Sequence, residues 1–355
     1  MSYFISQYNL EVEKVLSQDL SNDQLTSNIK WTRDLKKYLG NHIKLEYVSD
    51  LILDSAYRPF VRQKLYYEKH VNEMQYQIPN LFPGAEKRNL VICFTDPGSE
   101  KPFMALASDK IPDLHFCGAG CGTQCLSLYR YDENGNRIDN ITDWGLTQFQ
   151  THYSDPTITK QNIFHYTYAV LHHPAYRTKY ELNLKREFPR LPFYADFHQW
   201  AIWGKTLMDL HLKYETTEPY GLRRVDVGCT KANSDSPLQE TLIPTYEPDT
   251  TKPIKRTTPK AKLKADKTEG KIILDTETTL EGVPTVAWDY KLGNRSALEW
   301  ILDQYKEKTP KDPTIAKLFN TYRFADYKEQ VIDLLQRVCT VSVKTMEIIQ
   351  QMPTE

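Results

Sequence analysis

Residues 166–193 read YTYAVLHHPAYRTKYELNLKREFPRLPF, and this stretch tells most about the fold. Pro174 divides it, and because proline ends a preceding helix, the pattern predicts one helix before Pro174 and another after it. Phe164, Tyr168 and Leu171 recur at helical spacing, which predicts that one side of the first helix packs inward. The second helix is expected to project an aromatic and basic group of side chains, namely Tyr176, Arg177, Lys179 and Tyr180.

Four further stretches carry distinctive patterns. They are SAYRPFVRQKLYYE at 55–68, CLSLYRYD at 125–132, FHQWAIWGKTLMDLHL at 197–212 and LGNRSALEWILDQY at 292–305. In order and spacing, the five stretches together resemble the C-terminal specificity domain of Type ISP restriction-modification enzymes, and the resemblance spans nearly the whole chain. Two positions depart from the family pattern: Val61 follows YRPF where an acidic residue is common, and Cys125 starts a strand where Phe-Pro-Leu is usual.

The resemblance implies an α+β fold, in which a β-rich target-recognition part is flanked by helical segments that include a C-terminal helical region. It also implies sequence-specific binding of double-stranded DNA, which would be positioned for methyltransferase and helicase-nuclease segments located elsewhere, in cis or in trans. Residues 1–40 would join the methyltransferase in the parent architecture. By the same resemblance the chain carries no cofactor, because S-adenosylmethionine and ATP with Mg²⁺ belong to those other segments.

Local patterns divide the chain into five parts. We expect a helical segment at 1–40, a β-rich recognition part at 41–160, a helical part at 161–215, a Pro/Lys-rich loop or linker at 216–270, and short strands with C-terminal helices at 271–355. The individual elements predicted are helices at 8–20, 22–39 and 326–349 and strands at 90–94, 125–131, 271–275 and 283–290. Asn134-Gly135 is typical of a type I′ hairpin turn, and Ser296 with Glu299 predicts a capping box.

Composition sets limits on the class of protein. With 40% hydrophobic and 26% charged residues, the 355-residue chain is expected to form a globular fold with more than one substructure. Its formal net charge of −1 means that any DNA-binding surface must arise from local segregation of charge. No apolar stretch approaches the roughly 20 residues that span a membrane, so we expect a cytoplasmic protein without a membrane partner. Six cysteines in such a chain are expected to be reduced.

Several catalytic motifs are missing from the sequence. There is no G-x-x-x-x-G-K-[ST] loop for a triphosphate, no glycine-rich turn for a methyl donor and no Asn-Pro-Pro-Tyr-type loop for a flipped adenine. The sequence therefore favours a binding module that is not itself an enzyme.

Two groups of residues are candidates for DNA contacts. The first interleaves cations with tyrosines and comprises Arg58, Arg62, Lys64, Tyr66, Tyr67 and Lys69. These side chains could bond to phosphates or guanine edges, or they could form a solvated strand face with half-buried tyrosines. Arg58 is equally open to a structural role as a buried, paired arginine. The second group comprises Arg177, Lys179, Lys185, Arg186 and Arg190, for which a solvated helix face is the alternative.

Other segments would complete the interface. Polar loop residues between 95 and 160 are expected to enter a groove and read base edges. A basic run within and just after the linker is either a flexible arm with nonspecific affinity or a plain loop, and it comprises Lys252, Lys255, Arg256, Lys260, Lys262, Lys264, Lys267 and Lys271.

Two alternative functions remain open. His115, Cys117, Cys121 and Cys125 could wrap a zinc ion in a protein-interaction module, although their spacing differs from that of common zinc sites. The other interpretation is a glycine-rich loop with ordinary buried thiols. A stand-alone hydrolase would need a cleft that joins His172 and His173 to Asp196 and His198, and no matched partner can be named for them from the sequence.

Overall fold

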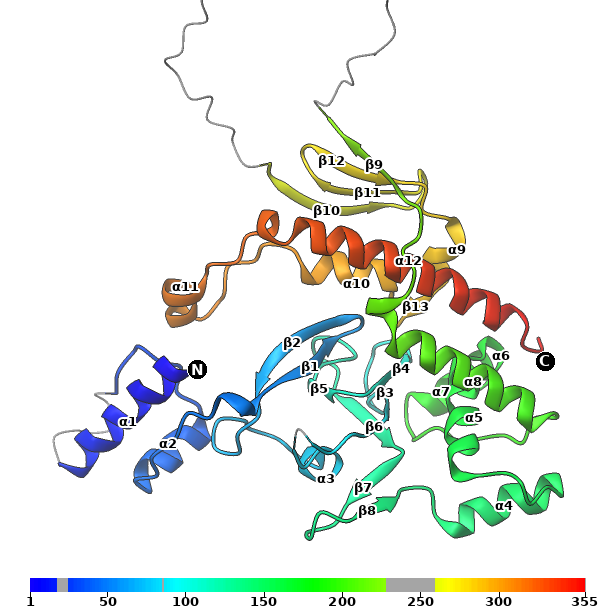
Figure 1. The fold of residues 1–355 in the computed structure, drawn as a ribbon, viewed down its shortest axis with the longest axis horizontal. Coiled ribbons are helices and arrows are strands. Elements are labelled where there is room, and N and C mark those ends of the chain that lie inside the picture. The colour runs from blue at the N-terminus through cyan, green and yellow to red at the C-terminus, as the bar shows by residue number, and fades with distance from the viewer. Residues whose placement is uncertain (18–24, 85, 228–258, 355) are drawn as a thin grey trace, which may run out of the picture.

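The computed structural model describes residues 1–17, 25–84, 86–227 and 259–354 (Figure 1). The helices of this part are α1 (Ser2–Leu16), α2 (Arg33–Gly40), α3 (Ile78–Leu81), α4 (Asp143–Tyr153), α5 (Lys160–His172), α6 (Pro174–Lys179), α7 (Glu181–Leu184), α8 (Phe197–Leu212), α9 (Thr285–Asp289), α10 (Ala297–Gln304), α11 (Pro313–Phe319) and α12 (Lys328–Gln350). Short 3₁₀ turns lie at Ser49–Leu51, Tyr214–Thr216 and Phe324–Asp326.

The strands form several small sheets rather than one large one. Their bounds are β1 (Ile52–Arg58), β2 (Val61–Tyr66), β3 (Val91–Thr95), β4 (Ala105–Ser108), β5 (Ile111–Pro112), β6 (Thr123–Ser127), β7 (Tyr129–Tyr131), β8 (Arg137–Asp139), β9 (Arg223–Asp226), β10 (Ala261–Asp266), β11 (Lys271–Asp275), β12 (Thr278–Glu281), β13 (Lys291–Leu292) and β14 (Arg295–Ser296). The sheet orders are β2-β1-β5, β4-β3-β6, β7-β8, β10-β11-β12-β9 and β13-β14. The expected α+β class is confirmed.

Strand β3 lies at the centre of the molecule, and all five of its residues are buried. It pairs antiparallel with β4 on one side and β6 on the other. Successive strand residues point to opposite faces, so Val91 and Cys93 enter one hydrophobic cluster while Ile92 and Phe94 enter another. The sheet therefore separates two cores.

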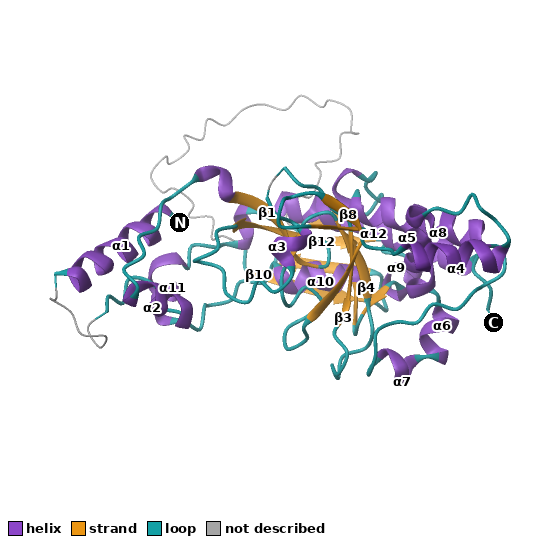
Figure 2. Ribbon diagram, turned by 90° about the horizontal axis from the view of Figure 1, so that it is seen from below, coloured by secondary structure: helices purple, strands orange, loops and turns teal. Residues whose placement is uncertain are grey.

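One of these cores lies under the helical part of the chain. Helices α5 and α8 pack directly against each other, and both contact strand β4 (Figure 2). Phe164, Tyr168 and Leu171 of α5 are buried, which confirms the predicted inward side. Gly204 of α8 allows the close approach, because a Cβ there would lie only 1.7 Å from the backbone oxygen of His165.

The other core joins the recognition part to the C-terminal part. It runs without a break from Ala56 and Phe60 at β1 to Val338 and Val341 of α12. The four-stranded sheet β10-β11-β12-β9 lies at one end of the molecule, and helices α10 and α12 lie next to it (Figure 1). The recognition part thus has no separate hydrophobic core facing the C-terminal part.

The N-terminal helices form a third, smaller cluster of their own. The Tyr8 hydroxyl donates to the Ile43 oxygen at 3.0 Å, which ties α1 to the segment after α2. The predicted second helix at 22–39 is too long: α2 begins at Arg33, because Thr32 is the N-cap and its side chain accepts the Leu35 N–H.

Three further predictions of local structure are wrong. The predicted strand at 283–290 is helix α9, which starts directly after Pro284. The predicted strand at 125–131 is divided at Leu128 into β6 and β7. The Asn134-Gly135 turn is not type I′, since among its two residues only Gly135 has a positive φ, and the loop is closed by Asp132, which accepts the Asn134 and Asn136 N–H groups.

The segment predicted as linker, 216–270, is not all loop. Its ends contribute β9 and β10 to the four-stranded sheet, because Leu263 is buried between exposed lysines in an alternating pattern. Lys252, Lys255 and Arg256 of the basic run lie outside the described residues. Strand β11 at 271–275, the Ser296–Glu299 capping box and the last helix agree with the predictions.

Candidate nucleic-acid interface

The β1–β2 hairpin presents the first group of candidate residues. Its turn is fixed by Phe60, which has a φ of 58° and packs its buried ring against Tyr214 with 5.2 Å between ring centroids. Arg62 and Lys64 point from the same face of β2, and each has an acidic partner. The Arg62 guanidinium lies 2.6 Å from Glu215, and the Lys64 ammonium lies 2.7 Å from Asp54 across the strand pair.

Arg58 and Tyr66 of this group are structural. The Arg58 side chain is 11% exposed, lies 2.6 Å from Asp113 and donates to the Tyr57 oxygen. The buried Tyr66 hydroxyl donates to the Glu46 oxygen and accepts the Val48 N–H. The Tyr66 hydroxyl is fully used inside the fold, and Arg58 Nη1 holds both Asp113 and the Tyr57 oxygen, so both residues stabilise the hairpin.

The remaining members of the first group lie nearer the solvent. Lys69 is exposed, and Tyr67 is half-buried, so that burial raises the pKa of its hydroxyl. Tyr67 lines a large hollow beside the hairpin. Lys64, Lys69 and Tyr67 thus remain available for a partner.

The second group of candidates is divided in the same way. Arg177 does not project outward as predicted: its Nε donates to the Leu171 oxygen and its Nη2 is shielded from solvent. This burial lowers the pKa of Arg177 to about 10. Tyr176 is also buried, and its hydroxyl donates to the Arg190 oxygen. The side of this short helix that reaches solvent carries Thr178 and Lys179 instead.

Four cations of the second group lie at or near the surface. Lys185 pairs with Glu181 at 2.7 Å and Arg190 pairs with Glu187 at 2.6 Å. Lys179 and Arg186 are exposed, and neither has an ion pair with another described residue. The surface therefore offers isolated cations here instead of a continuous basic strip.

The cysteine-rich loop holds its potential zinc ligands in other contacts. The His115 Nδ1 donates to the Cys121 oxygen, the Cys121 thiol donates to the Gly122 oxygen, and the Cys125 sulfur lies 3.7 Å from that of Cys93. Burial raises the pKa of the Cys117 thiol well above its usual range. Within the described ranges no group of three or more His, Cys, Asp or Glu residues is arranged to hold a metal.

The histidines considered for a hydrolase are each bonded elsewhere. His172 Nδ1 donates to the Tyr168 oxygen, His173 Nε2 donates to the Pro353 oxygen, and His198 pairs with Asp155 at 2.6 Å. Asp196 is the N-cap of α8 and accepts the Gln199 N–H. These residues serve separate local contacts and do not form a catalytic set.

A hollow of about 680 Å³ lies beside the hairpin. One wall is formed by the ends of β3 and β6, with Asp96 and Gln124, whose amide donates to the Asp96 carboxylate at 2.7 Å. The other wall is the loop 72–77. Met74 and Tyr76 of this loop have positive φ values of 55° and 46° and are 56% and 72% exposed. Exposed apolar side chains on a strained loop are typical of contact surfaces.

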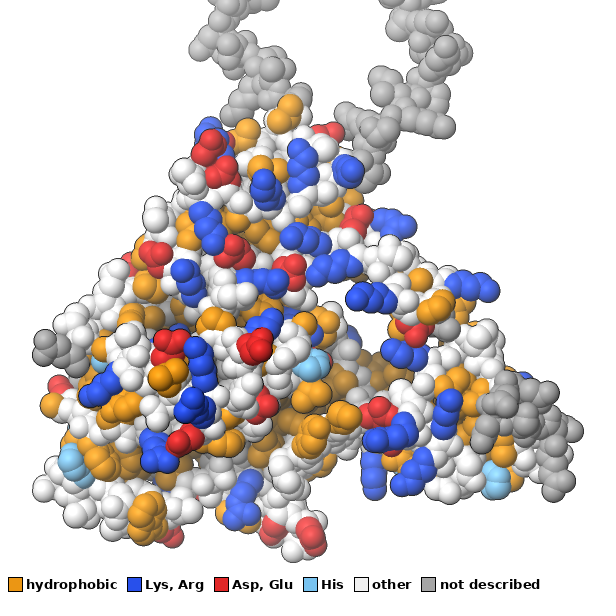
Figure 3. Space-filling view, turned by 180° about the vertical axis from the view of Figure 1, so that it is seen from behind, with side chains coloured by type: hydrophobic (Ala, Val, Ile, Leu, Met, Phe, Trp, Pro, Cys, Tyr) orange, Lys and Arg blue, Asp and Glu red, His pale blue; other side chains and the backbone are white. Residues whose placement is uncertain are grey.

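Figure 3 shows Lys and Arg side chains spread widely over one face of the molecule, with Asp and Glu side chains among them. A second hollow is lined by further cations that the sequence patterns did not indicate, namely Lys101, Arg295 and Lys308. Lys101 and Arg295 stand in no basic run, and Lys308 belongs to a separate group of lysines at 306–311, so no local signal shows that the three converge.

Comparison with known protein families identifies the family of this chain. The family described as the Type ISP C-terminal specificity domain matches residues 1–334. The chain belongs to this family. No curated protein matches this Type ISP specificity domain, and no helix of its described part is long and apolar enough to cross a membrane.

Three solved structures that are similar to this Type ISP specificity domain contain longer chains. A DrdV–DNA complex determined by cryoEM is 45% identical, with a TM-score of 0.84 over 99% of this chain and 33% of that chain. A nuclease-deletion mutant of the Type ISP enzyme LlaGI in complex with a DNA substrate mimic is 28% identical, with a TM-score of 0.72 over 99% of this chain and 30% of that chain. The ATP-dependent Type ISP enzyme LlaBIII bound to DNA is 25% identical, with a TM-score of 0.73 over 99% and 21%. The chain spans a third or less of each.

Proposed function

We propose that this chain binds a specific sequence of double-stranded DNA and positions it for methyltransferase and helicase-nuclease segments carried elsewhere. One observation carries the proposal: over 99% of its length the chain is 45% identical to part of DrdV, whose structure is that of a DNA complex. The family supports the separation of site selection from chemistry, since a specificity domain selects the site at which other segments act.

Phosphate contacts would position the duplex and base contacts would select the sequence. Lys64, Lys69, Lys179, Lys185, Arg186 and Arg190 are the predicted phosphate contacts that reach the surface. Surface ion pairs are weak, about 0–1 kcal/mol, so a phosphate can replace the carboxylate partners of Lys64, Lys185 and Arg190.

Base readout fits the hollow of about 680 Å³ beside the hairpin. Asp96, Thr123 and Gln124 lie in its wall and belong to the 95–160 region. Amide and carboxylate groups pair with base edges, Gln with adenine and Asp with cytosine. A wall that contains carboxylates repels phosphates, so it suits base edges better than the DNA backbone.

The chemistry would belong to other segments. We infer that this chain has no catalytic role and no cofactor of its own, and that S-adenosylmethionine and ATP with Mg²⁺ act in the methyltransferase and helicase-nuclease segments. The sequence supports this, because it lacks the glycine-rich loops that bind these nucleotides.

A fluorescence anisotropy titration of the full chain with duplex DNA tests the proposal. Binding should weaken steeply between 50 and 200 mM salt, since counterions are released from each contacted phosphate. Selection from a random duplex library should enrich one sequence. In a competition titration, an equal concentration of an unrelated duplex should not displace the enriched duplex from the chain. Binding that does not depend on salt, or a library without enrichment, would refute the proposal.

A further inference from the structure

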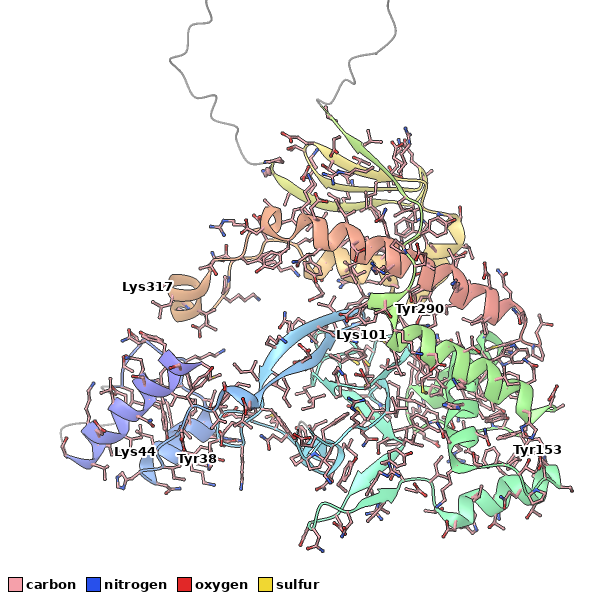
Figure 4. All side chains as sticks on the ribbon, in the orientation of Figure 1. Tyr38, Lys44, Lys101, Tyr153, Tyr290 and Lys317 are labelled. Carbon is pink, nitrogen blue, oxygen red and sulfur yellow. The ribbon has the colours of Figure 1, made fainter. Side chains whose placement is uncertain are left out.

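The second hollow, of about 250 Å³, opens between the recognition part and the C-terminal part of the molecule. Five segments form its wall, and one of them is the end of β1 with Tyr57 and Arg58; the other four lie far from it in the sequence. These four are the β3–β4 loop with Lys101, the glycine loop at Gly118 and Ala119, the β13–β14 turn with Arg295, and the end of α10 with Asp303. Figure 4 labels Lys101, which lies near the middle of the molecule beside the β1–β2 hairpin.

This hollow contains more positive than negative charge. Arg58, Lys101, Arg295 and Lys308 line it, and Asp303 is the one carboxylate among the residues of its wall. Arg58 is already paired with Asp113. Asp303 is shared, since Arg295 lies 3.1 Å and Lys308 lies 3.4 Å from its Oδ2. A single carboxylate cannot compensate both of these cations and Lys101 as well.

Lys101 is the cation of this hollow that has no acidic partner among the described residues. Its side chain lies at a half-buried position, and within the described part of the chain no carboxylate lies within 4.0 Å of its ammonium group. Partial burial makes an uncompensated charge unfavourable. An anion in the hollow would remove that cost.

Arg295 is held in place before any ligand arrives. The Gly293-Asn294 turn fixes its backbone, and its guanidinium carbon lies 5.2 Å from the centroid of the Trp300 ring. Trp300 is itself fixed, because its Nε1 donates to the Leu292 oxygen at 2.9 Å. Gly118 has a φ of 127°, and a Cβ there would touch Trp300 at 3.4 Å, so glycine keeps this wall close to the ring.

We infer that this hollow binds a backbone phosphate of the duplex through Lys101, Arg295 and Lys308. The inference rests on the proposed function. Arginine and lysine donors form charge-assisted hydrogen bonds with phosphate oxygens, and a volume of about 250 Å³ admits a phosphate group with its remaining water. The contact clamps DNA at the junction of the two parts, away from the hollow assigned to base readout.

Salt-dependent binding measures this contact directly. The double substitution Lys101→Ala and Arg295→Ala should reduce the magnitude of the slope of log affinity against log salt by about 0.9, the value for one phosphate. Affinity should fall on the order of tenfold, equally for the selected and unrelated duplexes. Asp303→Asn should tighten binding, because it frees Arg295 and Lys308 for the phosphate.

Lys205→Ala is the matched control, since Lys205 is an exposed lysine that pairs with Asp209 and does not line either hollow. It should leave the slope unchanged, and circular dichroism should show that every variant is folded. An unchanged slope in the double variant, with salt-dependent binding by the wild type, would overturn this inference and leave the proposed function standing. If the wild type binds no duplex, both this inference and the proposed function are refuted.

Discussion

Arg58 shows how a residue in a basic and aromatic stretch can be structural. Its guanidinium is enclosed between Tyr57 and Asp113, whereas Lys64, six residues later, is 71% exposed beside Asp54. Sequence alone gives these two cations the same context. Burial distinguishes them, because a buried charge must keep its partner while an exposed charge can exchange it.

Replacement of Arg58 should therefore affect stability more than DNA binding. We expect Arg58→Met to lower the free energy of unfolding by about 2 kcal/mol, since it leaves the Asp113 carboxylate partly buried without its cation. Lys64→Met should change it by less than about 0.5 kcal/mol. Urea denaturation of both variants measures the difference. Equal effects of the two substitutions would contradict the structural role of Arg58.

The buried histidines His172 and His211 predict a dependence of stability on pH. Burial lowers the pKa of His211 to about 3, and it also lowers the pKa of His172 well below its usual value. Both are neutral in the folded chain, while the unfolded chain takes up protons below about pH 6.5. The free energy of unfolding should keep its full value above pH 6.5. Below pH 6.5 it should fall by up to about 1.4 kcal/mol per pH unit for each histidine.

Denaturation at pH 7, 6 and 5 tests this, with His211→Asn as the matched variant. That substitution breaks the bonds of His211 to Tyr168 and Thr345 and so lowers stability at every pH. Its stability should nevertheless fall less steeply below pH 6.5, because one titrating group is gone. The same slope in both proteins would be evidence against the assignment.

At the scale of elements, the contact between α5 and α8 depends on one residue without a side chain. We expect Gly204→Ala to destabilise the protein by about 3 kcal/mol or more, since the added Cβ would meet the His165 backbone, which cannot move alone. Gly40→Ala at the end of α2 is the control, because nothing lies within 4 Å of the added atom. Thermal unfolding should separate the variants clearly, and a Gly204→Ala protein as stable as the control would show that the helices can move apart.

The loop 72–77 is expected to affect sequence preference and not the strength of phosphate contacts. Tyr76→Ala should reduce the affinity ratio between the selected and unrelated duplexes by about tenfold and leave the salt slope unchanged. The side chain is 72% exposed, so stability should not change. Anisotropy titrations with both duplexes measure the ratio. If affinity for both falls equally, the loop contacts the backbone and does not read bases.

At the scale of the whole molecule, the recognition part and the C-terminal part share one core that includes Ala56 and Val338. A protease site inserted between residues 240 and 241 should therefore give two fragments that stay together in size-exclusion chromatography. Val338→Asp, which places a charge in this core, should make the cut fragments separate. Separation of the fragments with Val338 intact would contradict the shared core.

The sequence by itself determined the family, the α+β class and the elements with strong local signals. The Ser296–Glu299 capping box, strand β11 and helix α12 follow from hydrogen bonds and periodicities within a few residues. The strand predicted at 283–290 is helix α9, and the linker predicted at 216–270 supplies β9 and β10, because pairing with distant segments decides such short elements.

Only the tertiary structure decided which cations are buried, which are paired and which converge. Arg58 pairs with Asp113 and Arg177 lies over the ring of Phe103, both distant in the sequence, whereas Lys101, Arg295 and Lys308 come from three separate segments and line one hollow. The physical reason is that charge acts through distance in space and through burial. Neither quantity is contained in the order of residues along the chain.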